Sequence, residues 1–152
     1  MPVRTSAPAS NARQNDPGST QPPWGNQRAS ALTGMPASSK ASQPVTGRIT
    51  AVRYIPGRFL PAYRPDAARA NERCEISIDH DGTTVIARQV VGVLARRVVC
   101  RARPEQAVRA GERYGIMKFG SRMDVFLPPT ADLRVAVGDR TRGGETVIAV
   151  LH

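Results

Sequence analysis

Few residues of this 152-residue chain have side chains suited to chemistry, and the most suggestive are the pair Gly120-Ser121. The pair lies within residues 114–128, where apolar and polar residues alternate on both sides of it. This alternation predicts two strands, and a glycine inside such a run marks a bulge, a bend or a close backbone approach. A glycine also leaves its carbonyl unhindered by a side chain. Gly120 is therefore either a structural kink or a place where chemistry needs an unhindered carbonyl.

The other candidate side chains are better explained by structure than by catalysis. His80 lies between two aspartates in a predicted hairpin turn, where turn chemistry accounts for the acids, and His152 is the last residue. Asp124 follows Ser121 by three positions, so in a strand the two side chains would project from opposite faces. Local spacing therefore cannot assemble a Ser-His-Asp relay.

Metal and nucleotide sites are not indicated. Cys74 and Cys100 belong to no CxxC pair and have no histidine at metal-ligand spacing, so we expect two small buried apolar side chains and no metal. The sequence also lacks a P-loop, a GxGxxG loop, an HExxH helix and a GxSxG elbow.

The chain is strongly basic, with a formal net charge of +10 and a pI of about 11.1. The usual partners of such a surface are nucleic acid and anionic lipid headgroups. Aromatic residues make up only 5% of the chain, which argues against a base-stacking platform. We therefore expect no nucleic acid among the partners. No apolar run is long enough to cross a bilayer and no signal peptide is evident, so we expect peripheral membrane contact without a transmembrane segment.

The elements that must position Gly120-Ser121 are predicted to be strands. Residues 1–43 are rich in Ser, Pro, Ala, Gly, Asn and Gln and are expected to form a disordered tail before a single β domain over 44–152. Turn signals at Pro56-Gly57 and at 79–82 separate the strands, and residues 67–72 suggest a single helical turn. Alternating or β-rich runs predict a mainly β sandwich or barrel, with strands over 45–54, 74–78, 83–91, 98–100, 114–119, 122–127, 133–137 and 146–151.

A short repeat refines this architecture. Residues 108–114 recur as residues 141–147, and each copy is a polar turn followed by Gly-Glu and a strand. The unit resembles that of lipoyl- and biotinyl-carrier domains, which have a barrel-sandwich fold and carry a modified lysine between their two halves. Lys118 lies just before Gly120-Ser121 in the corresponding region. A carrier domain modified on Lys118 is therefore one alternative, which an intact mass without an adduct would exclude.

Gly120-Ser121 also belongs to a longer series of matches to one family. Residues 119–128 resemble the self-processing site of phosphatidylserine decarboxylase in its short bacterial and archaeal form. The resemblance covers about residues 44 to 151. The other segments that resemble this family, in family order, are 44–47, 54–63, 71–73, 91–100 and 143–149.

The resemblance implies a proenzyme that cuts itself between Gly120 and Ser121. The Ser121 hydroxyl would attack the Gly120 carbonyl, and elimination would leave residue 121 as an N-terminal pyruvoyl group, the covalent cofactor. The two fragments would stay together as a heterodimer. The pyruvoyl carbonyl would form a Schiff base with the amine of phosphatidylserine and accept the electrons left by CO₂, giving phosphatidylethanolamine. The implied location is peripheral, on the cytoplasmic side of the cell membrane, and homo-oligomerisation is left open.

The sequence departs from the family upstream of Pro44. Family members carry there an Asp in an Ala-Asp-Gly setting and a His in an Asp-Val-His-like setting, which activate the serine, but the first histidine here is His80. We therefore expect slow or absent self-cleavage, and we attribute the difference to a truncated, misassembled or frameshifted N-terminus. The alternative from another class is a non-catalytic basic β domain that binds anionic lipid or nucleic acid.

Overall fold

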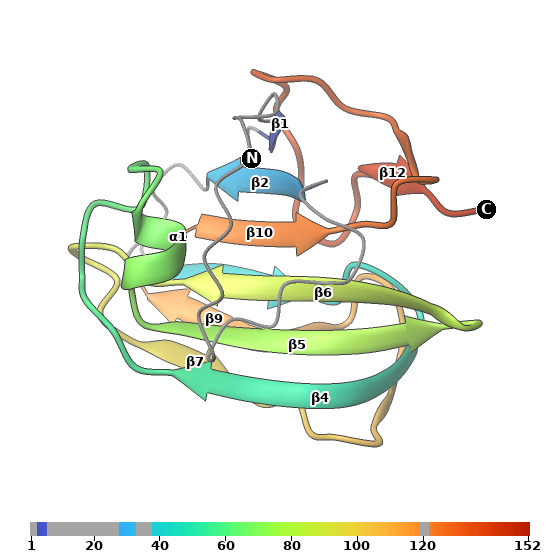
Figure 1. The fold of residues 1–152 in the computed structure, drawn as a ribbon, viewed down its shortest axis with the longest axis horizontal. Coiled ribbons are helices and arrows are strands. Elements are labelled where there is room, and N and C mark those ends of the chain that lie inside the picture. The colour runs from blue at the N-terminus through green and yellow to red at the C-terminus, as the bar shows by residue number, and fades with distance from the viewer. Residues whose placement is uncertain (1–2, 6–27, 33–37, 119–121) are drawn as a thin grey trace, which may run out of the picture.

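The computed structural model describes residues 3–5, 28–32, 38–118 and 122–152. Regular structure in these ranges is almost entirely β, arranged as a large curled sheet packed against a smaller one (Figure 1). Helix α1 (Ala67–Ala70) is a single turn at the position predicted for it. The prediction of a mainly β, barrel-sandwich-like domain is confirmed.

The larger sheet has seven antiparallel strands within the described residues, in the order β1-β2-β10-β6-β5-β4-β8. The smaller sheet has the order β3-β9-β7, and β11 pairs separately with β12. The strand bounds are β1 Val3–Thr5, β2 Arg28–Leu32, β3 Ser38–Ser42, β4 Gly47–Ile55, β5 Arg73–His80, β6 Thr83–Val90, β7 Val98–Cys100, β8 Ala107–Val108, β9 Arg113–Lys118, β10 Arg122–Phe126, β11 Asp132–Leu133 and β12 Ala149–Val150.

The hairpin of β5 and β6 lies at the centre of the larger sheet, and its turn follows from its sequence. Asp81 and Gly82 adopt left-handed backbone conformations, with φ of 51° and 82°. Two successive positive φ values are what a two-residue type I′ turn requires, and Asp-Gly favours that turn. The turn sets the register along all of β5, from His80 beside it to Arg73 at the far end. The predicted hairpin is therefore confirmed.

The apolar core lies between the two sheets and takes alternate residues from each strand. Ile76 and Ile78 of β5 are fully buried, as are Val85 and Ala87 of β6. Met123 and Val125 of β10 join the same cluster, as does Tyr114 of β9. Burying one such isoleucine contributes about 1.5–3 kcal/mol, and a one-residue slip would turn the whole apolar set outward. The core therefore fixes the register of the strands that reach the candidate site.

The two copies of the sequence repeat form turns that touch each other. Gly111 and Gly144 have left-handed backbones, with φ of 81° and 85°, and a Cβ built on Gly111 would lie 2.8 Å from the Gly144 carbonyl oxygen. In each turn the glutamate N–H, of Glu112 or Glu145, donates to the carbonyl three residues earlier. Strand β9 follows the first turn directly, whereas the second turn leads through non-strand backbone to β12. What repeats is the turn rather than the strand after it.

The structure differs from the prediction near both ends of the chain. Strands β1, β2 and β3 lie within the tail predicted over 1–43, because β10 and β9 offer free backbone edges with which a polar segment can pair. Most of that tail lies outside the described residues, so its extent stays a prediction. The last two predicted strands shrink to β11 and β12, because Leu133, Val137 and Val147 are exposed and give them no buried face.

Candidate active site

The predicted reactive segment connects two different sheets. Strand β9 belongs to the smaller sheet and ends at Lys118, whereas β10 belongs to the larger sheet and begins at Arg122. Gly120 and Ser121 lie between these ends and fall outside the described residues. The prediction of a strand on each side of them is confirmed, but the two strands do not form one ribbon. The chain changes sheets at this point, which we call the crossing.

The crossing lies at the end of the molecule that carries α1. In Figure 1, β9 points toward that end and β10 starts from it. Arg122 of β10 is opposite Val90 of β6, which in turn is opposite Arg73 at the start of β5. The Arg122 guanidinium also donates to the Arg64 carbonyl oxygen at 3.4 Å. The residue bonded to Ser121 is therefore anchored to the loop that precedes α1.

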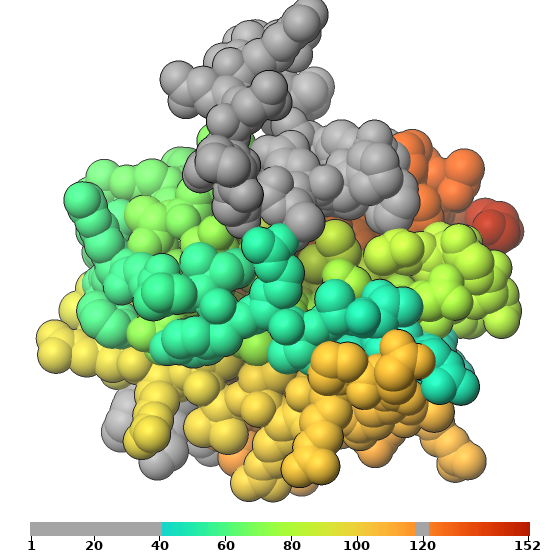
Figure 2. All heavy atoms as spheres, turned by 60° about the horizontal axis from the view of Figure 1, so that its bottom comes forward, coloured from blue at the N-terminus to red at the C-terminus, as the bar shows by residue number. Residues whose placement is uncertain are grey.

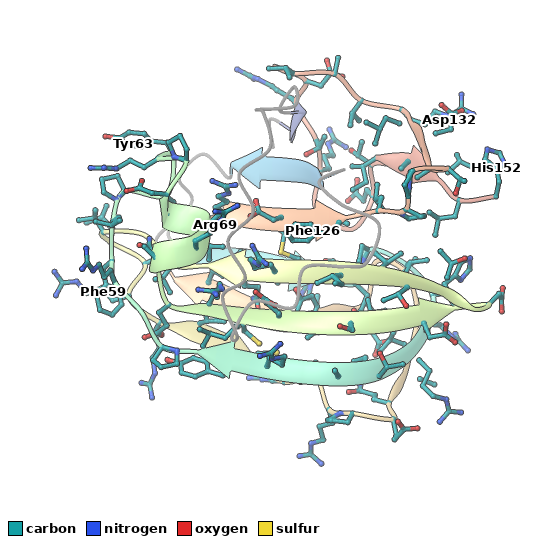
Figure 3. The ribbon with its side chains drawn as sticks, in the orientation of Figure 1. Phe59, Tyr63, Arg69, Phe126, Asp132 and His152 are labelled. Atoms are coloured by element: carbon teal, nitrogen blue, oxygen red, sulfur yellow. The ribbon has the colours of Figure 1, made fainter. Side chains whose placement is uncertain are left out.

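Both histidines of the sequence lie far from the crossing. His80 ends β5, whose 8 residues span about 23 Å at about 3.3 Å per residue. Its Nδ1 lies 2.7 Å from the Thr46 carbonyl oxygen and donates to it in the tautomer that carries the Nδ1 hydrogen. His152 lies on the opposite side of Figure 3 from α1. Neither imidazole lies near the end of β9 or the start of β10.

Five charged side chains form a row beside the crossing, and we call this row the charge ladder. Glu75, Arg88 and Asp124 are directly opposite one another on β5, β6 and β10. Arg88 Nε lies 2.8 Å from Glu75 Oε1, and Arg73 Nε lies 3.1 Å from the same oxygen. Arg122 Nε lies 2.6 Å from Asp124 Oδ1. None of the five side chains is more than 11% exposed, so the pairing offsets the cost of removing these charges from water.

Helix α1 and Phe126 cover the charge ladder. Ala67 and Ala68 are fully buried, and the Arg88 guanidinium donates to the Ala68 carbonyl oxygen at 3.4 Å. The same guanidinium lies 4.6 Å from the centroid of the Phe126 ring, in the middle of the molecule in Figure 3. Burial lowers the pKa of Arg88, whereas the neighbouring Glu75 and Asp124 carboxylates raise it. The guanidinium therefore stays charged in a nearly dry site.

Asp124 has a structural role that was not predicted from the sequence. It lies on the ladder face of β10, whereas Met123 and Val125 face the core. Its Oδ1 accepts from Arg122, but its Oδ2 is buried without a hydrogen-bond partner among the described residues. Buried polar atoms are seldom left unpaired. This carboxylate oxygen is thus an acceptor still available close to the crossing.

The sequence signal for the charge ladder was present but was not used. Glu75, Arg88, Arg122 and Asp124 stand inside runs that were predicted to be strands. Charged residues at such positions indicate either a solvated face or buried ion pairs, and the choice depends on the strand register, which local sequence patterns do not determine.

The two cysteine side chains meet between β5 and β7. The interaction between the two thiols raises the pKa of Cys74 and lowers the pKa of Cys100 to about 7. Burial acts against the lowering at Cys100, and a backbone hydrogen bond at Ala102 adds to it. The expected small, buried thiol is found at Cys74, whereas Cys100 is only half-buried. Their contact could not be predicted from the sequence, because it depends on how the sheets pack.

Alkylation of Cys100 is expected to follow a titration near pH 7. The folded pKa is lowered from 9.0 to about 7, so the reactive thiolate is abundant above pH 7 and is lost as the pH falls below it. Iodoacetamide labelling, followed by peptide mass spectrometry across a pH series, measures this midpoint. Cys74→Ala removes the donor thiol and should shift the midpoint toward 9. An unshifted midpoint in that variant would contradict the thiol–thiol contact.

Comparison with known proteins identifies relatives across the β domain. The family model described as phosphatidylserine decarboxylase matches residues 40–149. The phosphatidylserine decarboxylase proenzyme of Prosthecochloris aestuarii is 46% identical over 108 residues, which are 71% of this chain and 50% of that protein. The proenzyme of Mycobacterium ulcerans is 45% identical over 109 residues, which are 71% of this chain and 45% of that protein.

The chain thus spans about half the length of the curated relatives it matches. No solved structure matches the chain. Within the described residues, no helix has the length and apolar character needed to cross a membrane.

Proposed function

The chain belongs to the phosphatidylserine decarboxylase family, and from that premise we propose that Gly120-Ser121 is a self-processing site. After processing, the protein would convert phosphatidylserine to phosphatidylethanolamine as a peripheral membrane enzyme. The non-catalytic alternative, a basic β domain that binds lipid or nucleic acid, is not favoured by the match over residues 40–149.

The change of sheet at the crossing is the observation that best supports this proposal. A cut between residues 120 and 121 would leave β9 at the end of one fragment and β10 at the start of the other. Strand β10 is paired with β6 on one side and β2 on the other, and β9 is paired with β3 and β7. Each new end would therefore be held by its own sheet, and the fragments would stay together as a heterodimer.

Self-processing would begin when the Ser121 hydroxyl attacks the Gly120 carbonyl, so that the peptide becomes an ester. Elimination then breaks the bond from Cβ to the ester oxygen and releases the upstream chain with a carboxylate end. Hydrolysis of the dehydrated residue 121 releases its nitrogen as ammonia and leaves the pyruvoyl group. When present, that group supplies a carbonyl that accepts the electrons left by departing CO₂.

The described residues beside the crossing fit a reactive N-terminal group at residue 121. Arg122 is held by Asp124 at one side and by the Arg64 carbonyl at the other, so it would fix the backbone that follows the group. The free Oδ2 of Asp124 would be available to accept a hydrogen bond from the substrate or from the new chain end. A buried arginine close by would favour an anionic substrate group.

The decarboxylase proposal is tested with phosphatidylserine labelled in its carboxyl carbon. The expected result is release of labelled CO₂ together with phosphatidylethanolamine, from the processed chain only. Addition of sodium cyanoborohydride together with the substrate should inactivate the enzyme and leave a lipid amine bound at residue 121. Processed protein that forms no phosphatidylethanolamine would overturn the proposal.

As a 152-residue polypeptide, the chain is expected to process itself slowly, and the rate should not depend on His80. A well-placed general base is worth about 10²–10⁴-fold, and His80 lies at the far end of β5. The measurement is the rate of fragment formation after purification, for the unchanged chain and for His80→Asn. Rapid processing would contradict the expected slow rate, and a clear loss of rate in His80→Asn would contradict the placement of this imidazole.

A further inference from the structure

Large exposed apolar side chains gather at the α1 end of the molecule. Eight such side chains occur in the described part of the chain, and five of them lie in the loops at this end or at the end of β4. Tyr63 is 71% exposed and Leu94 is 61% exposed, and Figure 3 shows Tyr63 and Phe59 at the outer edge of this end. The five are Tyr54, Phe59, Tyr63, Val93 and Leu94.

Asn71 joins the two loops that carry most of these side chains, so the loops hold the apolar tips in exposed positions. Its side chain is fully buried, and its Nδ2 donates to the Leu60 carbonyl at 2.7 Å and to the Val91 carbonyl at 2.8 Å. Its Oδ1 accepts from the Leu60 N–H at 2.9 Å. Gly57 lies so close to the end of α1 that a Cβ there would be 2.5 Å from the Ala70 carbonyl oxygen. The loops of residues 56–66 and 91–97 are thus joined side by side.

Exposed arginines surround the apolar tips. Arg64 pairs with Asp66 at 3.0 Å. Arg58, Arg69, Arg96 and Arg97 form no ion pair with any described residue. Arg96 lies over the Phe59 ring, 5.9 Å from its centroid. In Figure 2 the green residues near position 60 and the yellow residues near position 95 together make the left end of the molecule. The exposed arginines are Arg58, Arg64, Arg69, Arg96 and Arg97.

We propose that this end, the docking end, seats on an anionic lipid bilayer. The docking end consists of the five apolar tips and the five arginines named above. Residues 56–66 and 91–97 hold four arginines and one acid, Asp66, so this end attracts an anionic surface. Tyrosines and aliphatic tips suit the headgroup boundary, and arginines beside them attract anionic lipid.

The docking end also places the bilayer beside the crossing, and this part of the inference rests on the proposed function. The Arg64 carbonyl in the first loop accepts from Arg122, which follows Ser121. A membrane-borne substrate would therefore meet residue 121 next to the surface from which it comes. Arg96 and Arg97, both exposed on the second loop, gain a headgroup role.

Binding to vesicles tests the charged part of the docking end. The full chain is sedimented with vesicles of phosphatidylcholine alone and with vesicles that also contain about 30 mol% of the anionic lipid phosphatidylglycerol. Arg58→Gln/Arg97→Gln should weaken partition to the anionic vesicles about 30-fold, because each arginine near the surface contributes about 1 kcal/mol. The control Arg101→Gln/Arg103→Gln removes the same charge from another exposed segment. It should change the partition to anionic vesicles less than threefold (about 0.6 kcal/mol). Equal losses in both variants would overturn the proposal.

Tryptophan reporters test the apolar part. Trp24→Phe/Leu94→Trp should show a blue shift of emission on anionic vesicles, whereas Trp24→Phe/Leu133→Trp should not. Leu133 is 43% exposed and lies toward the opposite end, so it is a matched apolar control. A shift at both positions, or at neither while the chain still sediments, would overturn the proposal. So would self-association that the arginine variant abolishes without any effect on vesicle binding.

Ser121→Ala separates this inference from the proposed chemistry. The variant cannot form the pyruvoyl group but keeps the docking end, so it should bind vesicles as the unchanged chain does. If the unchanged chain formed no pyruvoyl group, the proposed function would be wrong, but the vesicle-binding result would still hold. Loss of vesicle binding in Ser121→Ala would count against the docking end, because none of its named residues is changed.

Discussion

Ser121→Ala is expected to leave the chain uncut and to abolish formation of phosphatidylethanolamine. The alanine lacks the oxygen that must attack the Gly120 carbonyl, and it lacks the group that must be eliminated to give the pyruvoyl carbonyl. The expected result is a single polypeptide of residues 1–152 after prolonged incubation. Denaturing gel electrophoresis and a lipid assay with phosphatidylserine vesicles measure the two effects.

The matched control for that variant is Ser77→Ala. Ser77 lies on β5 and is half-buried, so its substitution removes one hydroxyl without changing the crossing. It should be processed as the unchanged chain is. If Ser121→Ala is still cut at the same bond, or if Ser77→Ala loses processing to the same extent, residue 121 is not the nucleophile.

Asp124→Asn is expected to lower the free energy of unfolding by about 3 kcal/mol or more. The amide would remove the Asp124 charge that pairs with the Arg122 guanidinium, in a site where neither side chain is more than 8% exposed. It would also remove one of the two carboxylates that compensate Arg88. Removing one partner of a buried ion pair costs about 3–5 kcal/mol, because the other charge is left buried and uncompensated. Urea unfolding should show a lower midpoint with an unchanged slope.

Asp132→Asn provides the comparison for the buried pair. Asp132 pairs with Arg134 at 2.9 Å, but both side chains are half exposed, so the loss should be about 0.2–1 kcal/mol. Both variants are best measured with Ser121→Ala present, so that each sample is one unbroken chain. Equal losses for Asp124→Asn and Asp132→Asn would mean that the charge ladder does not stabilise the fold.

Local sequence signals were enough to predict most individual elements. The hairpin of β5 and β6 follows from Asp81-Gly82 between two alternating runs, and α1 was expected where it occurs. Strands on both sides of Gly120-Ser121 follow from alternation alone. In these cases the residues that decide the structure are neighbours along the chain, so the sequence contains the whole argument.

Features that depend on distant pairing could not be predicted in the same way. The change of sheet between β9 and β10 depends on which strands pair, and that is set by the core between the sheets. The charge ladder needs the register that brings Glu75, Arg88 and Asp124 opposite one another. The contact of the two cysteine thiols likewise depends on sheet packing. Strands β1, β2 and β3 were missed because polar segments can add to a free edge through backbone hydrogen bonds alone.

Intact mass spectrometry of the purified chain tests the central claim most directly, because it reports cleavage and pyruvoyl formation together. After prolonged incubation, the account predicts two species, residues 1–120 and residues 121–152, and a chain that stays whole would contradict it. The shorter species should be lighter than the plain hydrolysis product by the difference between an N-terminal serine and a pyruvoyl group. Two fragments cut at this bond with an ordinary serine end, or cuts at other bonds only, would contradict the account.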